Sequence, residues 1–545
     1  MIIHSAEKKI CVVLIPALTT RGASPGDLLR KIDGRTLIQR SIDKAKELTK
    51  KSSAVYILTN SDEIALIGER NATTPVLLDN IENPADLLRA VQDSLQRFCQ
   101  TSTVCIRISP YAPLLGPEKI RAGRHEMEQK DKEGILLESS PSPWPTKTRN
   151  SLSSSYLIFG MERPAPGCPN SSFSVFRFED ILRPVHNAER IYFFKGGDDA
   201  LQIRTSQDWW VCEKLLKRRR LVFRVIGNDL VGMGHIYRAL TLAHELTDHE
   251  LFFVTDPESE SAVRDLAGSS YTVKICDLAS LVHSVCELKP DIVINDILDT
   301  QLNDVDLLQK AGAKVVNFED LGTGARKADL VINELYDEPQ IEGKNILWGR
   351  DYFFVRDEFA EARPNQSVEK VRGLLLTFGG VDQHNLSTKI YRKVRELCNE
   401  RGIRIYIVTG PGFSPYRALR DEIRGDTNVE LTHATGVISQ IMEKVEIAIS
   451  SNGRTVYELA HMSVPGIIVP QHTREKTHSF ACEKNGFIQL EPYVEGVTEL
   501  AVEQSLKTLL EDSSLRNKLF ESTRHFCFDK NKSDVVSRLL NLLSE

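Results

Sequence analysis

The sequence lacks paired cysteines, long hydrophobic runs and an excess of basic charge. Its ten cysteines are scattered singly between Cys11 and Cys527, without a C-x-x-C pair, which favours reduced thiols over disulfides or a zinc site. No stretch approaches the ~18–20 uninterrupted apolar residues of a membrane span, and residues 1–15 do not have the order of a secretion signal. The formal net charge of −6 argues against a general nucleic-acid-binding surface. We therefore expect a cytoplasmic protein with no membrane span and no nucleic-acid partner.

The composition is that of a folded protein with several domains. Of the 545 residues, 41% are hydrophobic and 26% are charged, and a chain of this length exceeds the ~250–300 residues of a single core. Short apolar runs alternate with amphipathic helices, which predicts parallel sheets with crossover helices. The sequence thus predicts three α/β lobes, called here the first lobe (1–216), the middle lobe (220–360) and the last lobe (368–545).

The apolar pattern also predicts the elements of the first lobe. The expected strands are 9–16, 54–59 and 103–108, the expected helices are 36–48, 84–98 and 208–216, and the expected Ser/Pro-rich loop is 139–155. The middle and last lobes repeat the alternation at similar size, which is typical of an enzyme whose ligand lies between two sheets.

A glycine-rich turn follows the first expected strand of the middle lobe. It reads Gly232-Met233-Gly234-His235 and leads into an expected helix at 236–246. Glycines at such a turn let the backbone approach a ligand and expose the first N–H groups of the helix, which favours an anion. His235 is expected to project into the cleft; the alternative is a histidine that caps or packs the turn.

A second turn of this kind lies between an expected strand and helix of the last lobe. There the backbone N–H groups of Gly453, Arg454 and Thr455 can bind a diphosphate, and Glu458 one turn later can accept hydrogen bonds from a ribose. Asn452 belongs to the same predicted binding turn; its alternative role is to cap the helix.

A third small-residue turn follows the first expected strand of the last lobe. It contains Gly379, Gly380 and Asp382, which we also expect to contact the substrate. Because all three turns follow strands of the two lobes, we expect them to face one cleft.

The motifs of the middle and last lobes resemble those of a known family. In chain order they are 232–246, Asn295-Asp296, Phe318-Glu319-Asp320, Gly379-Gly380-Val381-Asp382 and 450–460. Together they are similar to the UDP-sugar hydrolases of the pseudaminic acid pathway and the related spore-coat polysaccharide proteins, which have a glycosyltransferase-B-type fold. The resemblance runs from Leu221 to near the end of the sequence.

The resemblance implies an enzyme that hydrolyses a UDP-sugar. His235 would activate or position the water that attacks the anomeric carbon, with Asp296 as the second catalytic residue, and UDP and a free 2,4-diacetamido-trideoxyhexose would be released with inversion. A neutral imidazole suits this proton transfer near pH 7, and N–H donors stabilise the departing diphosphate. Arg238 would contact sugar or phosphate; its alternative is a surface salt bridge. The reaction needs no metal or cofactor.

The chain departs from the family pattern at two places. It has Arg474-Glu475 where the family tends to have Asn-Gln, and Ile297 follows Asp296 where a histidine is frequent. Both departures concern recognition of the sugar more than recognition of UDP.

The first lobe resembles the cytidylyltransferases that make CMP-activated sialic-acid-like sugars. The matching motifs are Ile15-Pro16-Ala17 with the loop 22–26, then 107–114 and 203–208. Such enzymes bind a nucleoside triphosphate with a basic glycine loop. Acidic residues hold the Mg²⁺ that neutralises charge as pyrophosphate leaves.

The catalytic positions of that family are replaced in this chain. Leu18 and Asp27 stand where the family has cations, and Tyr111 and Arg204 stand where it has metal-binding aspartates, while Asp208 is displaced and expected to cap its helix. The resemblance therefore predicts a Rossmann-type, nucleotidyltransferase-like domain that is catalytically degenerate and serves packing, homodimerisation or partner binding. The alternative is a bifunctional protein whose first lobe keeps CMP-sugar synthetase activity with CTP and Mg²⁺.

Three functions for the whole chain follow. The first is UDP-sugar hydrolysis in nonulosonic acid or surface polysaccharide biosynthesis. The second is a glycosyltransferase that uses the same UDP site with a sugar or lipid hydroxyl in place of water. The third is a non-catalytic scaffold that binds sugar nucleotides.

Overall fold

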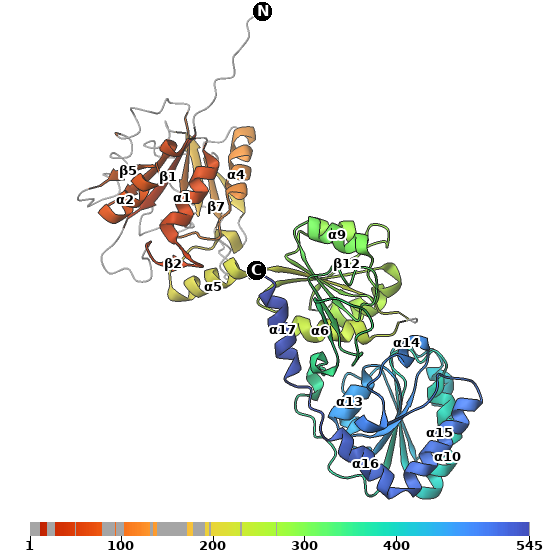
Figure 1. Cartoon of the computed structure of the whole chain (residues 1–545). Coiled ribbons are helices and arrows are strands. Elements are labelled where there is room, and N and C mark those ends of the chain that lie inside the picture. The colour runs from red at the N-terminus through yellow and green to blue at the C-terminus, as the bar shows by residue number, and fades with distance from the viewer. Residues whose placement is uncertain are drawn as a thin grey trace, which may run out of the picture. The chain divides into compact units, whose positions relative to one another are not determined.

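A computed structural model describes most of the chain. The described residues are 11–18, 28–49, 51–78, 93, 103–130, 134–138, 172–177, 191–195, 198–228, 231–268 and 270–543. The expected helix at 84–98 (apart from Asp93), the loop at 139–155 and the glycine loop 22–26 with Asp27 lie outside them. The chain divides into two compact units, Met1–Arg218 (unit 1) and Arg219–Glu545 (unit 2), which are coloured from red to yellow and from yellow-green to blue in Figure 1.

Unit 1 is built on a seven-stranded sheet with the order β5-β4-β1-β6-β8-β7-β9. Its described strands are β1 (Cys11–Ala17), β2 (Lys31–Ile32), β3 (Arg35–Thr36), β4 (Val55–Thr59), β5 (Thr74–Leu77), β6 (Val104–Ile108), β7 (Gly134–Glu138), β8 (Phe173–Arg177) and β9 (Ile191–Lys195). Its described helices are α1 (Leu37–Leu48), α2 (Asp62–Arg70), α4 (Pro117–Lys130) and α5 (Ser206–Lys217). The prediction of a parallel sheet is wrong here, because β8 runs antiparallel to both β6 and β7.

Local sequence explains the two helices of unit 1 that the pattern predicts. α1 begins after Thr36, whose hydroxyl accepts a hydrogen bond from the Gln39 N–H, and its apolar positions enter the core of the unit. α5 begins with a capping box in which Thr205 and Asp208 each accept a hydrogen bond from the other's backbone N–H. The expectation that Asp208 caps its helix is confirmed.

Unit 2 contains two fully parallel sheets. In the middle lobe the order is β12-β11-β10-β13-β14-β15-β16, and in the last lobe it is β19-β18-β17-β20-β21-β22. The first set comprises β10 (Arg220–Val225), β11 (Glu250–Thr255), β12 (Thr272–Ile275), β13 (Ile292–Asp296), β14 (Lys314–Phe318), β15 (Leu330–Asn333) and β16 (Ile346–Trp348). The second comprises β17 (Gly373–Thr377), β18 (Arg404–Thr409), β19 (Val429–His433), β20 (Ile447–Ser451), β21 (Gly466–Val469) and β22 (Phe487–Gln489). The predicted parallel sheets of these lobes are confirmed.

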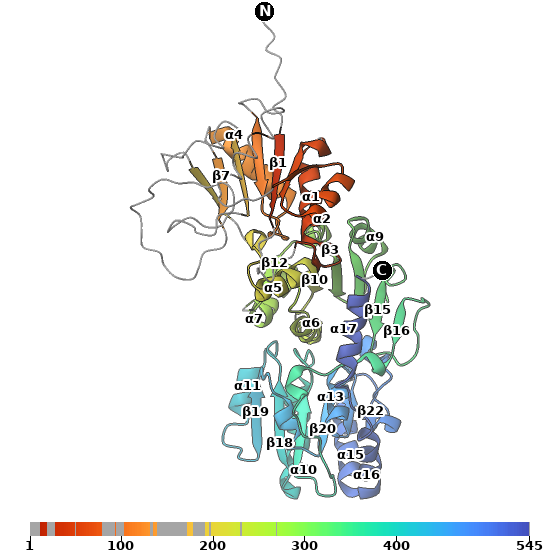
Figure 2. The ribbon, with the colours of Figure 1, turned by 90° about the vertical axis from the view of Figure 1, so that its left-hand side faces the viewer.

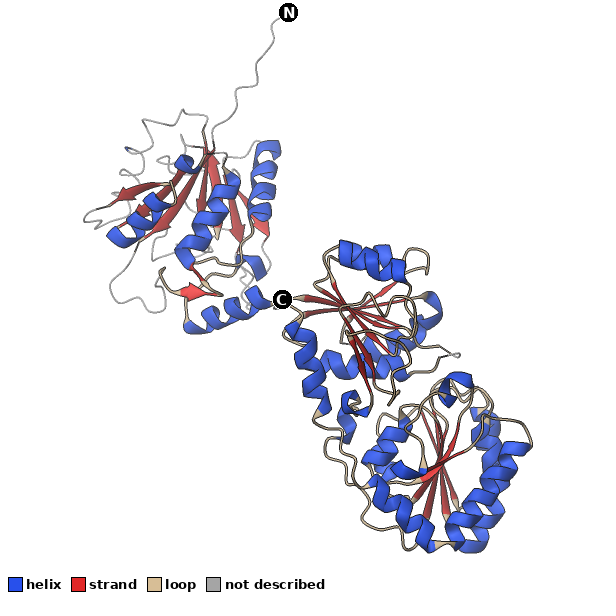
Figure 3. Ribbon diagram, viewed as in Figure 1, coloured by secondary structure: helices blue, strands red, loops and turns tan. Residues whose placement is uncertain are grey.

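Helices cover both faces of the two sheets of unit 2 (Figure 3). Those that follow strands of the middle lobe are α6 (Gly234–Glu245), α7 (Glu260–Ala267), α8 (Leu281–Glu287) and α9 (Leu302–Lys310). Those of the last lobe are α10 (Leu386–Arg401), α11 (Tyr416–Glu422), α12 (Ser439–Met442), α13 (Thr455–His461), α14 (Thr473–Lys476), α15 (Val497–Glu511) and α16 (Ser513–Thr523). Because both faces are covered, central strands such as β13 and β20 are buried at every position.

Each sheet of unit 2 reverses its strand order at one point. In both lobes the first strand along the chain lies between the second and the fourth. In the middle lobe the chain passes from β10 to β11 on one side and from β13 to β14 on the other side. In the last lobe β17 and β20 have the same arrangement. Ligands of open α/β sheets bind outside the carboxyl ends of the strands at such switch points. The predicted glycine turns follow β10, β17 and β20 and therefore lie at these two places.

The last helix, α17 (Asn531–Asn541), belongs to the middle lobe. Its Val535 and Leu539 are buried in one core with Leu221 of β10 and Leu242 of α6, and α17 runs beside α6 in both views (Figures 1 and 2). The assignment of all residues from 368 onward to the last lobe is therefore corrected for these residues: α17 covers its apolar face on the middle lobe.

Within the described part of the chain, no helix combines the length and the apolar character that crossing a membrane requires.

Candidate functional site

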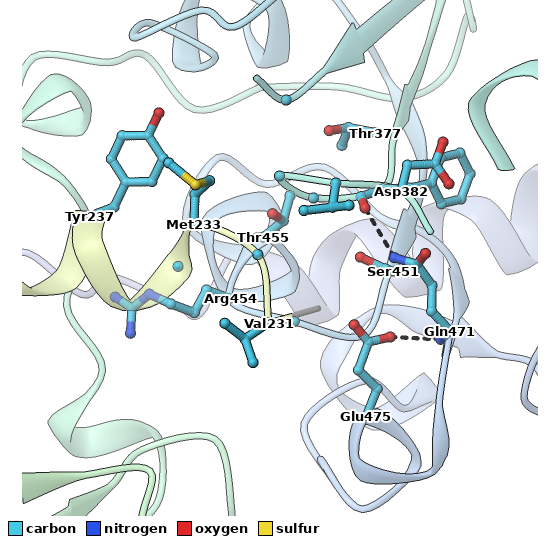
Figure 4. A pocket seen from close by; sticks show the side chains of 18 of the residues that line it. Val231, Met233, Tyr237, Thr377, Asp382, Ser451, Arg454, Thr455, Gln471 and Glu475 are labelled. Carbon is cyan, nitrogen blue, oxygen red and sulfur yellow. Dashed lines mark hydrogen bonds between the residues drawn. The ribbon is translucent and has the colours of Figure 1, made fainter. Parts of the chain in front are cut away.

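A pocket of about 300 Å³ opens between the two lobes of unit 2 at their switch points. Its walls come from the turns after β10, β17, β18, β19 and β20 and from the α14 region. Figure 4 shows Met233 and Tyr237 of the middle lobe on one side and Asp382, Gln471 and Glu475 of the last lobe on the other. The predicted site residues that line it are His235, Gly232, Gly234, Gly379, Gly380, Asp382, Gly453, Arg454, Thr455 and Glu458.

Two lobes meet closely at the glycine turns. Gly232 has a φ of +75° and Gly379 a φ of +79°, a backbone region that favours glycine. A Cβ on Gly380 would lie 2.9 Å from Met233 Cγ of the other lobe, so the absence of a side chain allows this contact. The structure therefore has the two lobes in contact around the pocket.

His235 lies in the first turn of α6 and forms a dyad with Asp296 at the end of β13. Its Nδ1 lies 2.6 Å from Asp296 Oδ1, and the other carboxylate oxygen accepts from Arg238 Nε at 2.7 Å. Because the Asp296 carboxylate only accepts, Nδ1 is the nitrogen that carries a proton, although Arg238 Nη2 also lies 3.2 Å from it; in the neutral imidazole the lone pair is then on Nε2. No described residue hydrogen-bonds to Nε2, and the side chain lines the pocket.

Arg238 lies beneath the pocket, and two expectations about it are wrong. The side chain is fully buried and is not part of the lining, so it forms neither a surface salt bridge nor a wall of the ligand space. It forms ion pairs with Asp296, Glu319 and Glu334. Burial opposes its charge, but Asp296 and Glu334 raise the pKa of Arg238 well above the usual value.

Asp296 also lies behind the lining and not in it. Burial alone would raise its pKa, but Arg238 and His235 outweigh burial and lower the pKa of Asp296 to about 2. Asp296 is thus an ionised carboxylate that orients His235 and cannot itself touch a ligand in the pocket.

The turn between β20 and α13 presents free backbone donors to the pocket. No described residue accepts a hydrogen bond from the backbone N–H of Gly453, Arg454 or Thr455. A Cβ on Gly453 would meet nothing within 4 Å, so the space beside this turn is open. The Arg454 guanidinium turns away from it, toward Glu334 and toward the Phe354 carbonyl at 2.9 Å.

Glu458 and Asn452 differ from expectation in what they contact. Glu458 Oε1 accepts from Arg356 Nε at 2.9 Å, which leaves the other oxygen without a partner among the described residues. Asn452 is absent from the lining and does not cap α13. It donates to the carbonyl oxygens of Glu475 at 2.6 Å and His478 at 3.0 Å, and so braces the turn from behind.

Asp382 lines the pocket, but its carboxylate is already in use. It has a φ of +51°, and its two oxygens accept from the backbone N–H groups of Leu386 and Ser387 at 2.7 Å each. Burial raises the pKa of Asp382. The carboxylate holds the start of α10, and the adjacent Gly379 and Gly380 backbone is what this turn offers to a ligand.

Several lining residues were absent from the predicted site. They are Glu319, Arg356, Thr409, Gly410, Pro411, Ala434, Thr435, Ile438, Arg474 and His478. Most follow strand ends, after β14, β18 and β19, so the rule that located the glycine turns could have located them too. Glu319 has a φ of +55°, a conformation that the sequence does not reveal.

The chain departs from the family pattern at Arg474, which links the two lobes, and at Glu475, whose partners lie in the last lobe. Arg474 reaches across the lobes to Asp299 at 3.1 Å and to the Glu319 carbonyl at 2.7 Å. Glu475 accepts from the Gln471 N–H at 2.7 Å, and burial raises the pKa of Glu475.

One cluster of metal-binding residue types occurs among the described residues, away from the pocket lining. His461, Cys527 and Asp529 bring ligand atoms within 4.8 Å of one another. However, His461 Nδ1 accepts from the Phe528 N–H, which leaves Nε2 protonated and directed at Asp529, 3.6 Å away. This arrangement does not offer a metal a nitrogen lone pair.

Three relatives are similar to part of this chain, and no family model matches it. An uncharacterized protein of Methanocaldococcus jannaschii is 24% identical over 46% of this chain and 55% of its own length. The spore coat polysaccharide biosynthesis protein SpsG of Bacillus subtilis is 24% identical over 46% of this chain and 77% of its own. A UDP-2,4-diacetamido-2,4,6-trideoxy-beta-L-altropyranose hydrolase of Campylobacter jejuni is 26% identical over 31% and 64%. The chain thus spans about half the length of the first of these relatives.

Solved structures resemble part of this chain, with low TM-scores and low sequence identity. MurG of Acinetobacter baumannii covers 59% of this chain and 99% of its own at 14% identity and a TM-score of 0.44. MnaA of S. aureus with UDP covers 60% and 98% at 15% identity and a TM-score of 0.42. The three relatives agree with the resemblance found in the middle and last lobes, and none is a cytidylyltransferase by name.

Proposed function

We propose that unit 2 binds a UDP-sugar in the pocket between its lobes and hydrolyses it to UDP and the free sugar, in nonulosonic acid or surface polysaccharide biosynthesis. One observation carries this proposal: His235, which Asp296 holds from behind, lines the same pocket as Gly453, Arg454 and Thr455 with their free N–H groups. A catalytic base and a diphosphate site in one pocket are the two parts that cleavage of a sugar–diphosphate bond needs.

The chemical step follows from the state of the dyad. His235 Nε2 takes a proton from water while the water oxygen bonds to the anomeric carbon. The bond from that carbon to the phosphate oxygen breaks, and its electron pair leaves with UDP. Asp296 stabilises the imidazolium that forms, as an oriented carboxylate does for a general base. The free N–H groups of the β20–α13 turn stabilise charge on the departing diphosphate.

The last lobe supplies the nucleotide end of the proposed site. The unpartnered oxygen of Glu458 can accept from a ribose hydroxyl while Arg356 holds the other oxygen. The turns after β18 and β19, with Gly410 and Ala434, line the pocket farther along the same sheet edge. They can enclose the uracil ring of the nucleotide.

Transfer of the sugar to a hydroxyl acceptor is the second candidate. Nε2 would deprotonate a hydroxyl group as readily as water, and the proposed UDP site is common to both reactions. A non-catalytic scaffold fits less well, because a scaffold has no need for an ionised Asp296 behind a histidine that faces the pocket.

Incubation of the purified chain with a panel of UDP-sugars separates these functions. We expect UDP release without an added acceptor, at a rate that acceptor sugars or lipids do not raise. Release that requires an acceptor would establish a transferase, and no release with or without acceptors would contradict both enzymatic functions.

We infer that unit 1 is a degenerate nucleotidyltransferase-like domain. The two segments where the resembled family holds Mg²⁺ lie side by side, since the Ile203 N–H donates to the Tyr111 carbonyl at 2.8 Å. Tyr111 and Arg204 offer a phenol and a guanidinium where magnesium prefers carboxylates, and Asp208 is bound to its own helix start. These residues do not fit the metal.

We therefore predict that the full chain makes no CMP-sugar when supplied with CTP, Mg²⁺ and a nonulosonic acid. Pyrophosphate release measures the reaction, with an active cytidylyltransferase as the positive control. Robust release would show that the chain is bifunctional and that the roles of Tyr111 and Arg204 are misassigned.

A further inference from the structure

One buried carboxylate receives an arginine from each lobe of unit 2. Glu334 directly follows β15 of the middle lobe and is fully buried. Its Oε1 accepts from Nη1 of Arg238 in α6 and from Nη1 of Arg454, which precedes α13 of the last lobe. The Glu334 carbonyl also accepts from the Tyr457 hydroxyl of the last lobe at 3.2 Å. Glu334 is therefore a point of attachment between the lobes.

The two arginines belong to opposite ends of the proposed site. Arg238 holds Asp296 through Nε, and Asp296 holds His235 Nδ1. Arg454 carries one of the free N–H groups of the diphosphate turn. A continuous series of hydrogen bonds therefore runs from the base through Asp296, Arg238 and Glu334 to the residue that would bind the leaving group.

The position of Arg454 depends on contact between the lobes. Its guanidinium bonds Glu334 and the Phe354 carbonyl and lies 4.5 Å from the centre of the Phe353 ring. If the lobes separated, Glu334 would lose the cation that comes from the last lobe. Arg238 would then be the one arginine still paired with Glu334, and it also forms ion pairs with Asp296 and Glu319.

We propose that Glu334 is a positioning residue that couples closure of the two lobes on a UDP-sugar to the alignment of His235. The inference rests on the proposed function. When Arg454 reaches Glu334, the shared carboxylate fixes Arg238 in the orientation that holds Asp296 and, through it, the imidazole. Binding of the diphosphate to the Arg454 turn would stabilise this bridge and, with it, the orientation of His235 in the other lobe. Such a device favours proton abstraction while the two lobes are in contact.

The Glu334→Gln variant tests this coupling, because it keeps the shape and removes the charge. We expect kcat for UDP release to fall about tenfold to 100-fold and KM to stay within about threefold, since a misplaced base affects the chemical step most. Glu495→Gln is the matched control, because Glu495 is an exposed glutamate paired with Lys389; it should change neither value.

The pH profile distinguishes positioning from loss of folded enzyme. The charged and titratable groups around His235 are Asp296 on β13, Arg238 on α6, Glu319 after β14, Glu334 after β15, and Arg454, Arg474 and His478 of the last lobe. Glu334→Gln removes one negative charge from this group and so stabilises the imidazolium less. The acid limb of kcat should move to lower pH, which a purely structural loss would not cause.

Hydrogen exchange with UDP provides a readout that does not depend on turnover. In the wild type, UDP should slow exchange both at residues 453–455 and at residues 233–236 of the other lobe. In Glu334→Gln it should slow exchange at 453–455 only. Unchanged kcat and pH profile in the variant, or protection of both segments in it, would overturn the proposal.

Failure of the proposed function can be distinguished from failure of the coupling. If the wild type released no UDP from any sugar, that function would be wrong, and the exchange pattern alone would decide the coupling. If Glu334→Gln did not fold, Arg454→Gln would replace it, because it removes the cation that reaches Glu334 from the other lobe and keeps the backbone N–H. It should reproduce the loss of kcat and the one-sided protection, and wild-type behaviour would contradict the coupling.

Discussion

His235→Ala is expected to lower UDP release by at least about 100-fold while UDP affinity stays within about threefold. The imidazole would accept a proton only in the transition state, so its loss should affect kcat, whereas the diphosphate binds to backbone groups of the last lobe. Steady-state kinetics and calorimetric titration of UDP measure the two effects separately.

The matched control for this prediction is His283→Ala. His283 lies on α8 of the same lobe with an exposed side chain and should leave both quantities unchanged. An equal loss of UDP affinity in His235→Ala would contradict the role of base, because it would make His235 part of the nucleotide site.

Arg238→Met is expected to destabilise unit 2 by about 3–5 kcal/mol, the cost of leaving buried carboxylates without their cation. Arg238 is the counter-charge of Asp296, Glu319 and Glu334, and methionine fills much of the volume without replacing the charge. Chemical denaturation of the full chain, with the transition of unit 2 followed by hydrogen exchange, measures the loss. Arg264→Met, which removes an exposed helical ion pair, should cost no more than about 0.5 kcal/mol.

The difference in stability between wild type and Arg238→Met should depend on pH in a definite direction. In the folded wild type the pKa of Asp296 is lowered to about 2, against about 3.9 in an unfolded chain. This carboxylate therefore contributes stability above pH 4 that is lost as the pH falls toward 2. Without Arg238 that contribution disappears, so the stability gap between wild type and variant should narrow from pH 5 to pH 2. A stability difference that widened from pH 5 to pH 2 would contradict the ion pair between Arg238 and Asp296. If Arg238→Met did not fold, Arg238→Lys should show a smaller loss of stability with the same pH trend.

The sequence predicted the parallel sheets of unit 2 and the turns that form its pocket. This was possible because apolar strands, glycines and helix starts are local signals, and because strand ends of parallel sheets meet at one edge. Gly232, Gly379 and Gly453 could be located in this way before the fold was known.

The charge network beneath the pocket could not be predicted. Arg238 meets Asp296, Glu319 and Glu334 at separations of 58, 81 and 96 residues, and no local pattern shows that three carboxylates will converge on one arginine. For the same reason Arg238 was expected to contact sugar or phosphate or to form a surface salt bridge, and the pairing of Glu458 with Arg356 was not foreseen.

Strand direction and helix placement were missed for a related reason. An apolar strand such as β8 has the same pattern whichever way it runs, so the mixed sheet of unit 1 was not foreseen. The apolar face of α17 shows that the helix must pack against another part of the protein. It does not show which lobe it packs against, and the structure places it on the middle lobe.

The central claim is that one pocket holds both the base and the diphosphate site for a single UDP-sugar. A crystal structure of His235→Ala with an intact UDP-sugar from the panel tests it most directly. The account predicts diphosphate oxygens within about 3 Å of the backbone nitrogens of residues 453–455, with the anomeric carbon facing the space that the imidazole leaves. A diphosphate bound elsewhere, or an anomeric carbon directed away from position 235, would contradict it.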